Sequence, residues 1–265
     1  MKKAENKVKI EGILSEVDIK TGESKTDSKP YIMGEIKVKV EQETNGVPYE
    51  MEVPISMFAT KYTKEGKINP AYESIEKISK EYTSIAAAGG EENADRIRIV
   101  SGEIKENCFY NQNGALVSYA RINSSFANRI KKNECTPEAT FTGVIVIGNI
   151  KEEIDKNEEP TGRLIIQAII PQYSKDESKP NVDMVTFYVA SEQAIHHINT
   201  YWNKGDTVKI AGKVNYSVST SVTYEEVGFG EPIAKTNTHT TREFIITSGS
   251  PEGFDEEMAY KQADI

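Results

Sequence analysis

Aromatic and basic side chains share one face of a predicted strand near residue 120. In residues 115–123, Tyr119 and Arg121 have the same parity, opposite to Ala120 and Ile122, and side chains two residues apart point to the same face of a strand. A guanidinium can pair with a phosphate, and a tyrosine ring can stack on a base. A single-stranded nucleic acid needs this combination, and stacking contributes roughly 1–3 kcal/mol per base whatever the sequence.

The same residue types recur on other predicted strands and give the remaining candidates for nucleic-acid binding. In the first half of the chain these candidates are Lys37, Lys39, Arg96, Arg98 and Tyr110. In the second half they are Arg163, Tyr173, Tyr188, Tyr224, Phe229, Lys235 and Arg242. Each of them also has an ordinary explanation, because outward Tyr, Lys and Arg are common on β surfaces. The argument therefore rests on the set and on the fold that carries it.

Motifs typical of enzymes are absent from the sequence. There is no GxxxxGK[ST] loop for phosphates, no GxSxG nucleophile elbow and no HExxH zinc motif. The 2 Cys and 3 His residues form no CxxC or HxxxH pair, so neither a metal site nor another cofactor is expected. Acidic pairs such as Glu152–Glu153 are typical of solvated surfaces. The sequence favours a binding protein over an enzyme such as a nuclease or a glycan hydrolase.

The elements that must position these side chains are almost all strands. Alternation of apolar and polar residues predicts strands at residues 7–19, 31–42, 49–55, 96–110, 115–123, 140–150, 163–171, 183–190, 207–219 and 242–247. Helical spacing predicts one helix over residues 68–85, and Ser191 can cap a second helix that runs to Trp202. Five strands with a helix between the third and the fourth is the order of the OB-fold, a partly open five-stranded barrel.

A repeated pattern indicates that this order occurs twice. Val-Ser-Gly-Glu-Ile at residues 100–104 is matched by Ile-Ala-Gly-Lys-Val at residues 210–214. Glycine inside a strand marks a bend or a close approach of two backbones, so we interpret these glycines as barrel curvature. The chain is thus expected to be mainly β, with two tandem OB-fold-like five-stranded barrels, each with one helix between strands 3 and 4. The expected domains are residues 1–132 and 139–248, with a long hairpin arm at 216–241 in the second.

The formal net charge of −9 is unevenly distributed. Acidic and basic residues nearly balance over residues 1–132, whereas residues 133–248 and 249–265 are net acidic. The first barrel can therefore hold a basic face, and the last 17 or so residues form an acidic tail of the kind that docks on partner proteins. The tail residues expected to contact a partner are Phe254, Asp255, Glu256 and Glu257. A disordered, solubilising terminus is the other interpretation of this segment.

Targeting signals are also missing from the sequence. No run of 18 apolar residues predicts a membrane span, and no apolar stretch follows the charged N-terminus as in a signal peptide. Two cysteines fit a reducing compartment. We therefore expect a cytoplasmic protein with no membrane partner.

The tandem barrels, the aromatic and basic faces and the acidic tip resemble single-stranded DNA-binding proteins, particularly those encoded by bacteriophages. Residues 224–233, followed by 241–247, are similar to a stretch found in such phage proteins. The resemblance implies a protein that coats exposed single-stranded DNA in replication or recombination in the cytoplasm of a bacterial host. It also implies an acidic tip that recruits replication or recombination proteins, and it leaves self-association open. The alternative is a phage structural or assembly adaptor with OB-like or β-sandwich domains and no nucleic-acid role.

Overall fold

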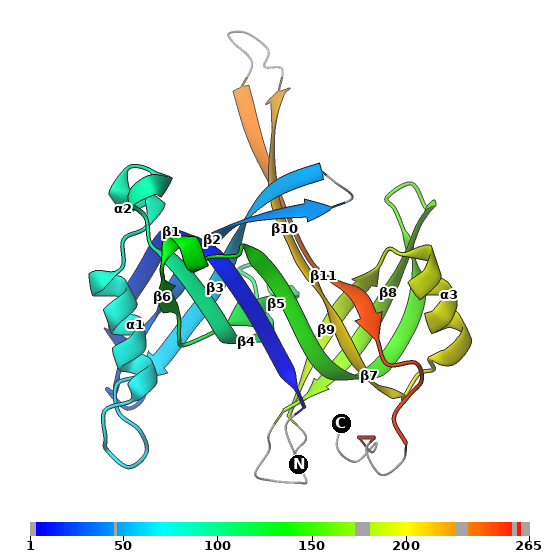
Figure 1. Cartoon of the computed structure of the whole chain (residues 1–265), viewed down its shortest axis with the longest axis horizontal. Coiled ribbons are helices and arrows are strands. Elements are labelled where there is room, and N and C mark those ends of the chain that lie inside the picture. Colours follow the sequence, from blue (N-terminus) through cyan, green and yellow to red (C-terminus); the bar gives the residue numbers. More distant parts are fainter. Residues whose placement is uncertain (1–3, 45–46, 173–180, 226–232, 256–258, 261–265) are drawn as a thin grey trace.

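The computed structural model describes residues 4–44, 47–172, 181–225, 233–255 and 259–260, with the backbone alone at residues 43, 44, 47, 48, 224, 225 and 233. Figure 1 shows two strand-built units side by side, with helices at their outer ends and a two-stranded arm projecting between them.

The first unit is a ring of five strands. Its members are β1 (Asn6–Glu23), β2 (Pro30–Thr44), β3 (Val47–Thr60), β4 (Arg96–Tyr110) and β5 (Leu116–Asn123). β1 pairs with both β2 and β4, and β5 pairs with both β4 and β3. The β3–β5 junction is parallel and short, with Ile55 opposite Ile122. The strand order 1-2-3-5-4-1 is that of a partly open OB barrel.

The second unit repeats this order. Its strands are β7 (Glu138–Ile154), β8 (Pro160–Pro171), β9 (Val182–Val189), β10 (Thr207–Glu225) and β11 (Ile233–Gly249). β7 pairs with β8 and β10, and the parallel junction places Ile245 of β11 opposite Tyr188 of β9. The expectation of a mainly β chain with two OB-like units is thereby confirmed.

The helices cover the open ends of the units. α3 (Glu192–Tyr201) begins after Ser191, whose side chain accepts a hydrogen bond from the Ala194 N–H, and ends at Trp202 as the sequence predicts. The helix expected over 68–85 is instead α1 (Pro70–Glu81) followed by α2 (Ile85–Ala88) and a 3-10 turn, η1 (Glu91–Asn93). The break has two causes: the Thr83 N–H donates to the carboxylate of Asp95, twelve residues further along the chain, and the Ser84 side chain starts a new cap.

Two short elements in the connection between the units were not predicted. These are β6 (Asn128–Ile130), which pairs with the first residues of β4, and the 3-10 turn η2 (Lys132–Glu134). Glu11 fixes the chain that follows. Its carboxylate, 1 % exposed, accepts two hydrogen bonds from Arg98 and one from the Thr136 N–H.

A shared strand pairing sets how the units sit against each other. β1 and β7 run antiparallel, from Asn6 opposite Gly143 to Glu11 opposite Glu138. The Asn6 side chain also bonds both the N–H and the C=O of Ile104. The two rings are therefore joined by backbone hydrogen bonds and form one continuous sheet.

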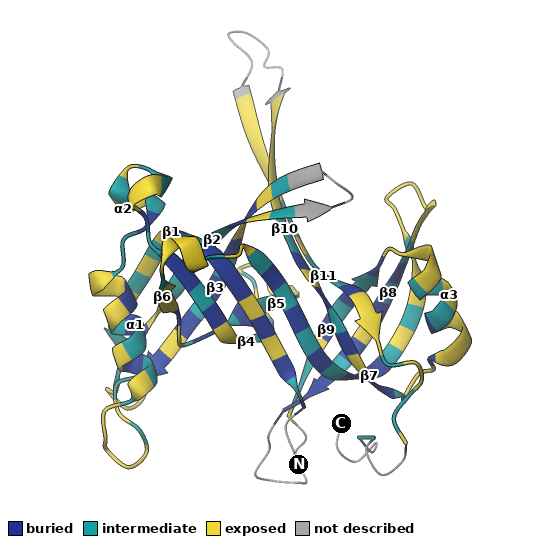
Figure 2. Cartoon of the chain, viewed as in Figure 1, coloured by how far each residue is buried: buried dark blue, intermediate teal, exposed yellow. Residues whose placement is uncertain are grey.

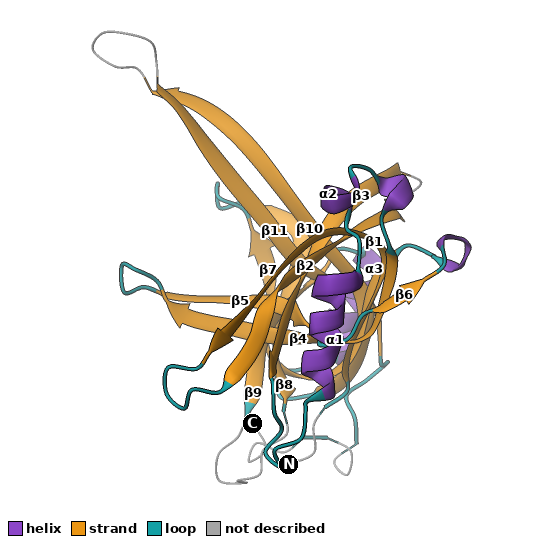
Figure 3. Ribbon diagram, turned by 90° about the vertical axis from the view of Figure 1, so that its left-hand side faces the viewer, coloured by secondary structure: helices purple, strands orange, loops and turns teal. Residues whose placement is uncertain are grey.

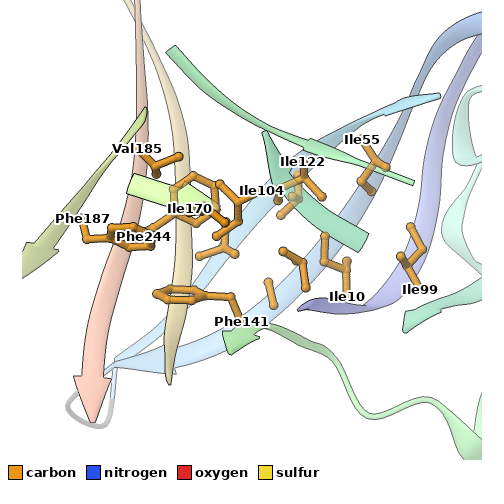
Figure 4. Close-up of a cluster of buried hydrophobic side chains, with 14 of the residues drawn as sticks. Ile10, Ile55, Ile99, Ile104, Ile122, Phe141, Ile170, Val185, Phe187 and Phe244 are labelled. Carbon is orange, nitrogen blue, oxygen red and sulfur yellow. The ribbon is translucent and has the colours of Figure 1, made fainter. Parts of the chain in front are cut away.

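The hydrophobic core extends through both units (Figure 2). In the second unit the rings of Phe141, Phe187 and Phe244 lie with their centroids 5.6–6.2 Å apart, and isoleucines fill the first unit (Figure 4). Gly212 belongs to this core. A Cβ atom there would overlap both the Ile245 carbonyl oxygen and the Phe141 ring, which supports the curvature role expected for the repeated glycines.

The arm is the outer part of the β10–β11 hairpin. Its pairing continues without a register shift from Gly212 opposite Ile246 to Glu225 opposite Ile233. Figure 3 shows it leaning away from the body of the molecule. Its base, at Tyr216 and Arg242, lies against the first unit, as described next.

Candidate nucleic-acid interface

Tyr119 and Arg121 lie on β5 and face away from the first unit's core. Ile122, which pairs with Ile55 of β3, is buried in that core. The side chains of Tyr119 and Arg121 are half-buried. Tyr119 is opposite Asn107 and Arg121 is opposite Lys105 on β4. The shared face that the alternation predicts is thus present in the structure.

Arg242 of the second unit reaches the same place. Its guanidinium carbon lies 4.5 Å from the centroid of the Tyr119 ring and 5.8 Å from that of Tyr216, its cross-strand partner on β10. The structure therefore brings Arg242 to Tyr119 and Arg121, although more than a hundred residues of sequence separate it from them. Sequence reasoning missed Tyr216, although its position opposite Arg242 in the hairpin could have revealed it.

These side chains line a small cleft of about 50 Å³ between the units. β2, β3 and β5 of the first unit and β10 and β11 of the second supply the lining, which includes Glu35 and Glu243. Cations beside flat rings in a cleft can hold a phosphate and a base together. This arrangement is the most complete match to the predicted chemistry among the described residues.

Arg121 and Arg242 form no ion pair with any described residue, unlike the candidates Lys37, Lys39, Arg98 and Arg163. The Arg121 Nε atom is buried and finds no hydrogen-bond acceptor within the described part of the chain. The Arg242 guanidinium contacts two rings there, and its charge acts on Glu35 without forming an ion pair. A planar guanidinium without a carboxylate partner is well suited to bind a phosphate in a bidentate manner.

The candidate lysines of the first unit, Lys37 and Lys39, are already paired with carboxylates of the chain. Lys37 Nζ lies 2.5 Å from a Glu16 carboxylate oxygen, and Lys39 Nζ lies 2.6 Å from Glu50 and 2.5 Å from Glu91. Because both ammonium groups donate hydrogen bonds to these carboxylates, the pKa of each lysine is raised above its ordinary value.

Arg96 and Arg98 are also bound to neighbouring groups of the chain. Arg96 is buried and donates to the carbonyl oxygens of Glu91 and Ala94. Arg98 is bound by Glu11. Neither these arginines nor Lys37 and Lys39 line the cleft, so the structure does not bring the four residues to Tyr119.

In the second unit, Arg163 and Tyr188 form a pair of their own. The Arg163 guanidinium lies 4.7 Å from the Tyr188 ring centroid and 2.9 Å from Glu243, which lines the cleft. Burial, together with the Glu243 carboxylate, raises the pKa of Tyr188. This cluster adjoins the cleft through Glu243, but its cation is already neutralised by Glu153 and Glu243.

The remaining candidates lie at the edges of the structure. Tyr110 is 74 % exposed at the end of β4, and Phe109 beside it meets Tyr119 edge-on with centroids 6.3 Å apart. Lys235 lies exposed on the arm. Tyr173, Phe229 and the side chain of Tyr224 lie outside the described residues.

A larger groove of about 850 Å³ continues from the cleft over the first unit. Cleft and groove share three lining residues, Glu35, Ser56 and Arg121. The groove also exposes apolar side chains, which are Met33 (47 %), Phe58 (59 %) and Phe126 (45 %). Tyr31 extends this surface, with its ring centroid 5.9 Å from that of Phe58.

These apolar residues were not among the candidates, although a signal existed for Phe58. Met57 and Ala59 on either side of it are buried, and the alternation that begins at Val53 continues through them. The strand expected to end at Ile55 runs on to Thr60, which places Phe58 on the outward face.

Glu35 lies where cleft and groove meet. It is half-buried, and burial raises the pKa of its carboxyl, an effect opposed by the charges of Lys37 and Arg242. Its carboxylate takes part in no hydrogen bond or ion pair with another described residue, unlike that of Glu243, which also lines the cleft. The interface therefore contains an acceptor as well as two cations.

The start of the tail is bound to the second unit. The Phe254 N–H donates to the Thr207 carbonyl, the Tyr260 N–H donates to the Thr207 hydroxyl, and the Trp202 indole donates to the Ser250 carbonyl. Phe254 is half-buried and Asp255 is exposed, while Glu256 and Glu257 lie outside the described residues.

The described residues contain no group of three or more His, Cys, Asp or Glu side chains arranged to hold a metal ion. None of their helices combines the length and the apolar character that crossing a membrane requires. Cys108 and Cys135 are not joined in a disulfide.

Comparison with known proteins supports the fold. No curated protein sequence matches the chain. Among solved structures, the chain is similar to the wild-type single-stranded DNA binding protein from Thermus aquaticus, with a TM-score of 0.57, 7 % identity and coverage of 98 % of both chains. It is also similar to a deletion mutant of that protein, with a TM-score of 0.54, 9 % identity and coverage of 97 % of this chain and 100 % of the other.

These likenesses concern the fold, since the sequences have diverged almost completely. One family matches at the level of sequence, over residues 4–265, which is nearly the whole chain. The chain belongs to the YorF family.

Proposed function

We propose that this protein binds single-stranded DNA with little dependence on sequence, by stacking bases on Tyr119 and neighbouring rings and by pairing phosphates with Arg121 and Arg242. The observation that carries the proposal is that the Arg242 guanidinium lies over the Tyr119 ring, beside Arg121. Neither arginine forms an ion pair with a described carboxylate. The similarity in fold to a protein described as single-stranded DNA binding supports it.

The path of the strand follows from the shape of the surface. Cleft and groove are continuous through Arg121 and Ser56. A strand in this position contacts Phe58 and Phe126 in the first unit and then Tyr216 and Arg242 in the second. The two domains, residues 1–132 and 139–248, thus contribute to one composite site rather than binding independently.

We further propose that the protein protects single-stranded DNA during replication or recombination in a bacteriophage setting. In this role the acidic tail, with Phe254, Asp255, Glu256 and Glu257, contacts a partner protein. The net acidic charge of residues 249–265 and the exposure of Asp255 support this assignment.

The proposal is tested by fluorescence anisotropy with a labelled oligo-dT and a labelled duplex at several salt concentrations. We expect micromolar or tighter binding of the single strand at low salt, weaker binding of the duplex, and a linear fall of log K with log salt. Removing one phosphate contact, in Arg121→Gln or Arg242→Gln, lowers the slope by about 0.7 for a single strand. Lys37→Gln is the matched control, because its charge is already balanced by Glu16.

Stacking is tested separately at Tyr119. Tyr119→Ala is expected to lose roughly 1–3 kcal/mol of binding free energy, whereas Tyr119→Phe keeps the ring and the affinity. No binding of oligo-dT by the wild-type protein at low salt refutes the proposed function. Equal effects of Lys37→Gln and Arg121→Gln refute the assignment of the site.

A further inference from the structure

Glu35 is a half-buried carboxylate at the junction of the candidate strand-binding cleft and groove. It lines both, together with Arg121 and Ser56. Carboxylates repel phosphates, so its presence between two cations is unfavourable for a site that only tracks the backbone. Its place in the site therefore calls for another partner.

The other carboxylates that line the cleft and the groove are already bound to neighbouring groups. Glu243 accepts hydrogen bonds from Arg163 and Asn215. Asp18 pairs with Lys20, and Glu103 lies 3.7 Å from Lys105. The Glu35 carboxylate makes no hydrogen bond or ion pair with the described residues, and burial raises its pKa because the charged form is poorly solvated there. A donor that reaches it would relieve this cost.

The surroundings of Glu35 are suited to a base rather than to a second phosphate. Exposed Met33, Phe58 and Phe126 line the same groove and offer apolar and aromatic surface for stacking. Arg121 borders the groove on the side of the cleft, where a phosphate can lie. A base that enters the groove from a backbone held at Arg121 comes within reach of Glu35, since both residues line the groove.

We propose that Glu35 reads guanine in the bound single strand, by accepting hydrogen bonds from the N1–H and the N2 amino group. Guanine presents two adjacent donors on this edge, which match the two acceptor oxygens of an ionised carboxylate. Thymine presents one donor between two carbonyl oxygens, and adenine and cytosine each place a ring-nitrogen acceptor next to the amino group. The inference rests on the proposed function and adds a base preference to it.

The test compares labelled oligo-dT strands that carry isolated dG, dI or dA residues at the same positions, at pH 8 in a lithium buffer. Isolated guanines do not form quadruplexes under these conditions, and inosine differs from guanosine only by the missing N2 amino group. We expect the dG strand to bind about three- to tenfold more tightly than the dI or all-dT strand. The reason is that guanine gives the otherwise unpaired carboxylate a charge-assisted hydrogen bond. In Glu35→Gln, which keeps the shape but loses one acceptor oxygen, this ratio falls to about one.

Asp18→Asn is the matched control, because Asp18 also lines the groove but is paired with Lys20. It is expected to keep the preference for dG. If all strands bind equally to the wild-type protein, or if Glu35→Gln keeps the preference, the guanine assignment is wrong while single-strand binding stands. If no strand binds, the proposed function itself fails. Circular dichroism of Glu35→Gln establishes that the variant is folded.

Discussion

The guanidinium of Arg242, in the second unit, lies over the ring of Tyr119, in the first, with 4.5 Å between the guanidinium carbon and the ring centroid. β1 and β7 join the units through backbone hydrogen bonds, and Lys105 of the first unit pairs with Asp183 of the second. The contact of Arg242 with Tyr119 is a further side-chain link between the units. Tyr216 and Phe109 flank it, one from each unit. The site therefore depends on how the two units are placed.

The first prediction concerns the energy of that contact. A double-mutant cycle of Tyr119→Ala and Arg242→Ala, measured by urea unfolding, is expected to show a coupling of about 0.5–1 kcal/mol, the size of a cation–π pair at a partly exposed site. Pairing Tyr119→Ala with Arg129→Ala is the control. Arg129 packs on Tyr82 at the far end of β4, so these two changes should add. A coupling of zero for Tyr119 and Arg242 would show that the rings and the guanidinium do not interact in solution.

The second prediction concerns the charge of Glu35. Glu35→Gln is expected to raise the affinity for oligo-dT about two- to fivefold at pH 8, because thymine gives the carboxylate no matched pair of donors and its charge opposes phosphates near Arg121 and Arg242. The gain should shrink as salt increases. Unchanged affinity at low salt contradicts the placement of the backbone beside Glu35.

The affinity of the wild-type protein for oligo-dT should also depend on pH through this residue. Burial raises the pKa of Glu35 above its ordinary value of 4.5, so as pH falls the carboxyl takes up a proton earlier than an exposed one. The oligo-dT affinity should then rise in the wild-type protein and change less in Glu35→Gln. The charged groups that act on Glu35 or line the cleft and groove with it are Glu16, Asp18, Lys37, Glu103, Arg121, Arg242 and Glu243.

The fold was largely predictable because its signals are local. Alternation located the strands, the bounds of β4 were predicted to the residue, and Ser191 marked the start of α3. Errors arose where a distant contact decides the local structure. The break between α1 and α2 depends on Asp95, which accepts a hydrogen bond from Thr83 across twelve residues of sequence.

The site was predictable only in part, for the same reason. Parity on β5 places Tyr119 and Arg121 on one face, but nothing local shows that Arg242 stacks on Tyr119 from another unit. Conversely, Lys39 and Arg98 alternate outward as a binding face would, yet carboxylates from distant strands or turns neutralise them. Whether a surface cation is free depends on tertiary packing, and periodicity does not report it.

The third prediction concerns Glu11, which fixes the connection between the units. Glu11→Gln is expected to cost about 1–3 kcal/mol of unfolding free energy, because a buried acceptor of three hydrogen bonds loses its charge while Arg98 keeps its own. Arg98 holds the pKa of Glu11 below the ordinary 4.5, with further help from the Thr136 N–H. A group whose pKa is lower in the folded than in the unfolded state stabilises the fold at pH values above its unfolded pKa. This stabilisation is lost as the pH falls through the folded pKa.

The difference between the wild-type protein and Glu11→Gln should therefore be full at neutral pH and shrink below about pH 4.5. Urea unfolding followed by circular dichroism measures it. Glu16→Gln, at an exposed carboxylate on the same strand, should change the stability little. A difference that stays constant down to pH 3 would contradict the ion pair as its cause.

The fourth prediction concerns the anchored start of the tail. Trp202, the single tryptophan of the chain, is 5 % exposed and donates its indole N–H to the Ser250 carbonyl 3.1 Å away. His197 bonds the Pro251 carbonyl, and Tyr260 packs against the core. Removing residues 251–265 is expected to lower the unfolding free energy by about 1–3 kcal/mol, since the contacts of Pro251, Phe254 and Tyr260 and their buried apolar surface are lost, and Ser250, the partner of Trp202, becomes an unanchored chain end.

Because one tryptophan supplies the signal, its emission should shift to longer wavelength in the truncated protein as water reaches the indole. Truncation after residue 260 is the matched control, because it removes part of the acidic tail but keeps the contacts of Pro251, Phe254 and Tyr260. This shorter truncation should leave both the stability and the emission unchanged. If both truncations behave alike, the anchoring contacts do not contribute, and the segment from residue 251 onward acts only through its charge.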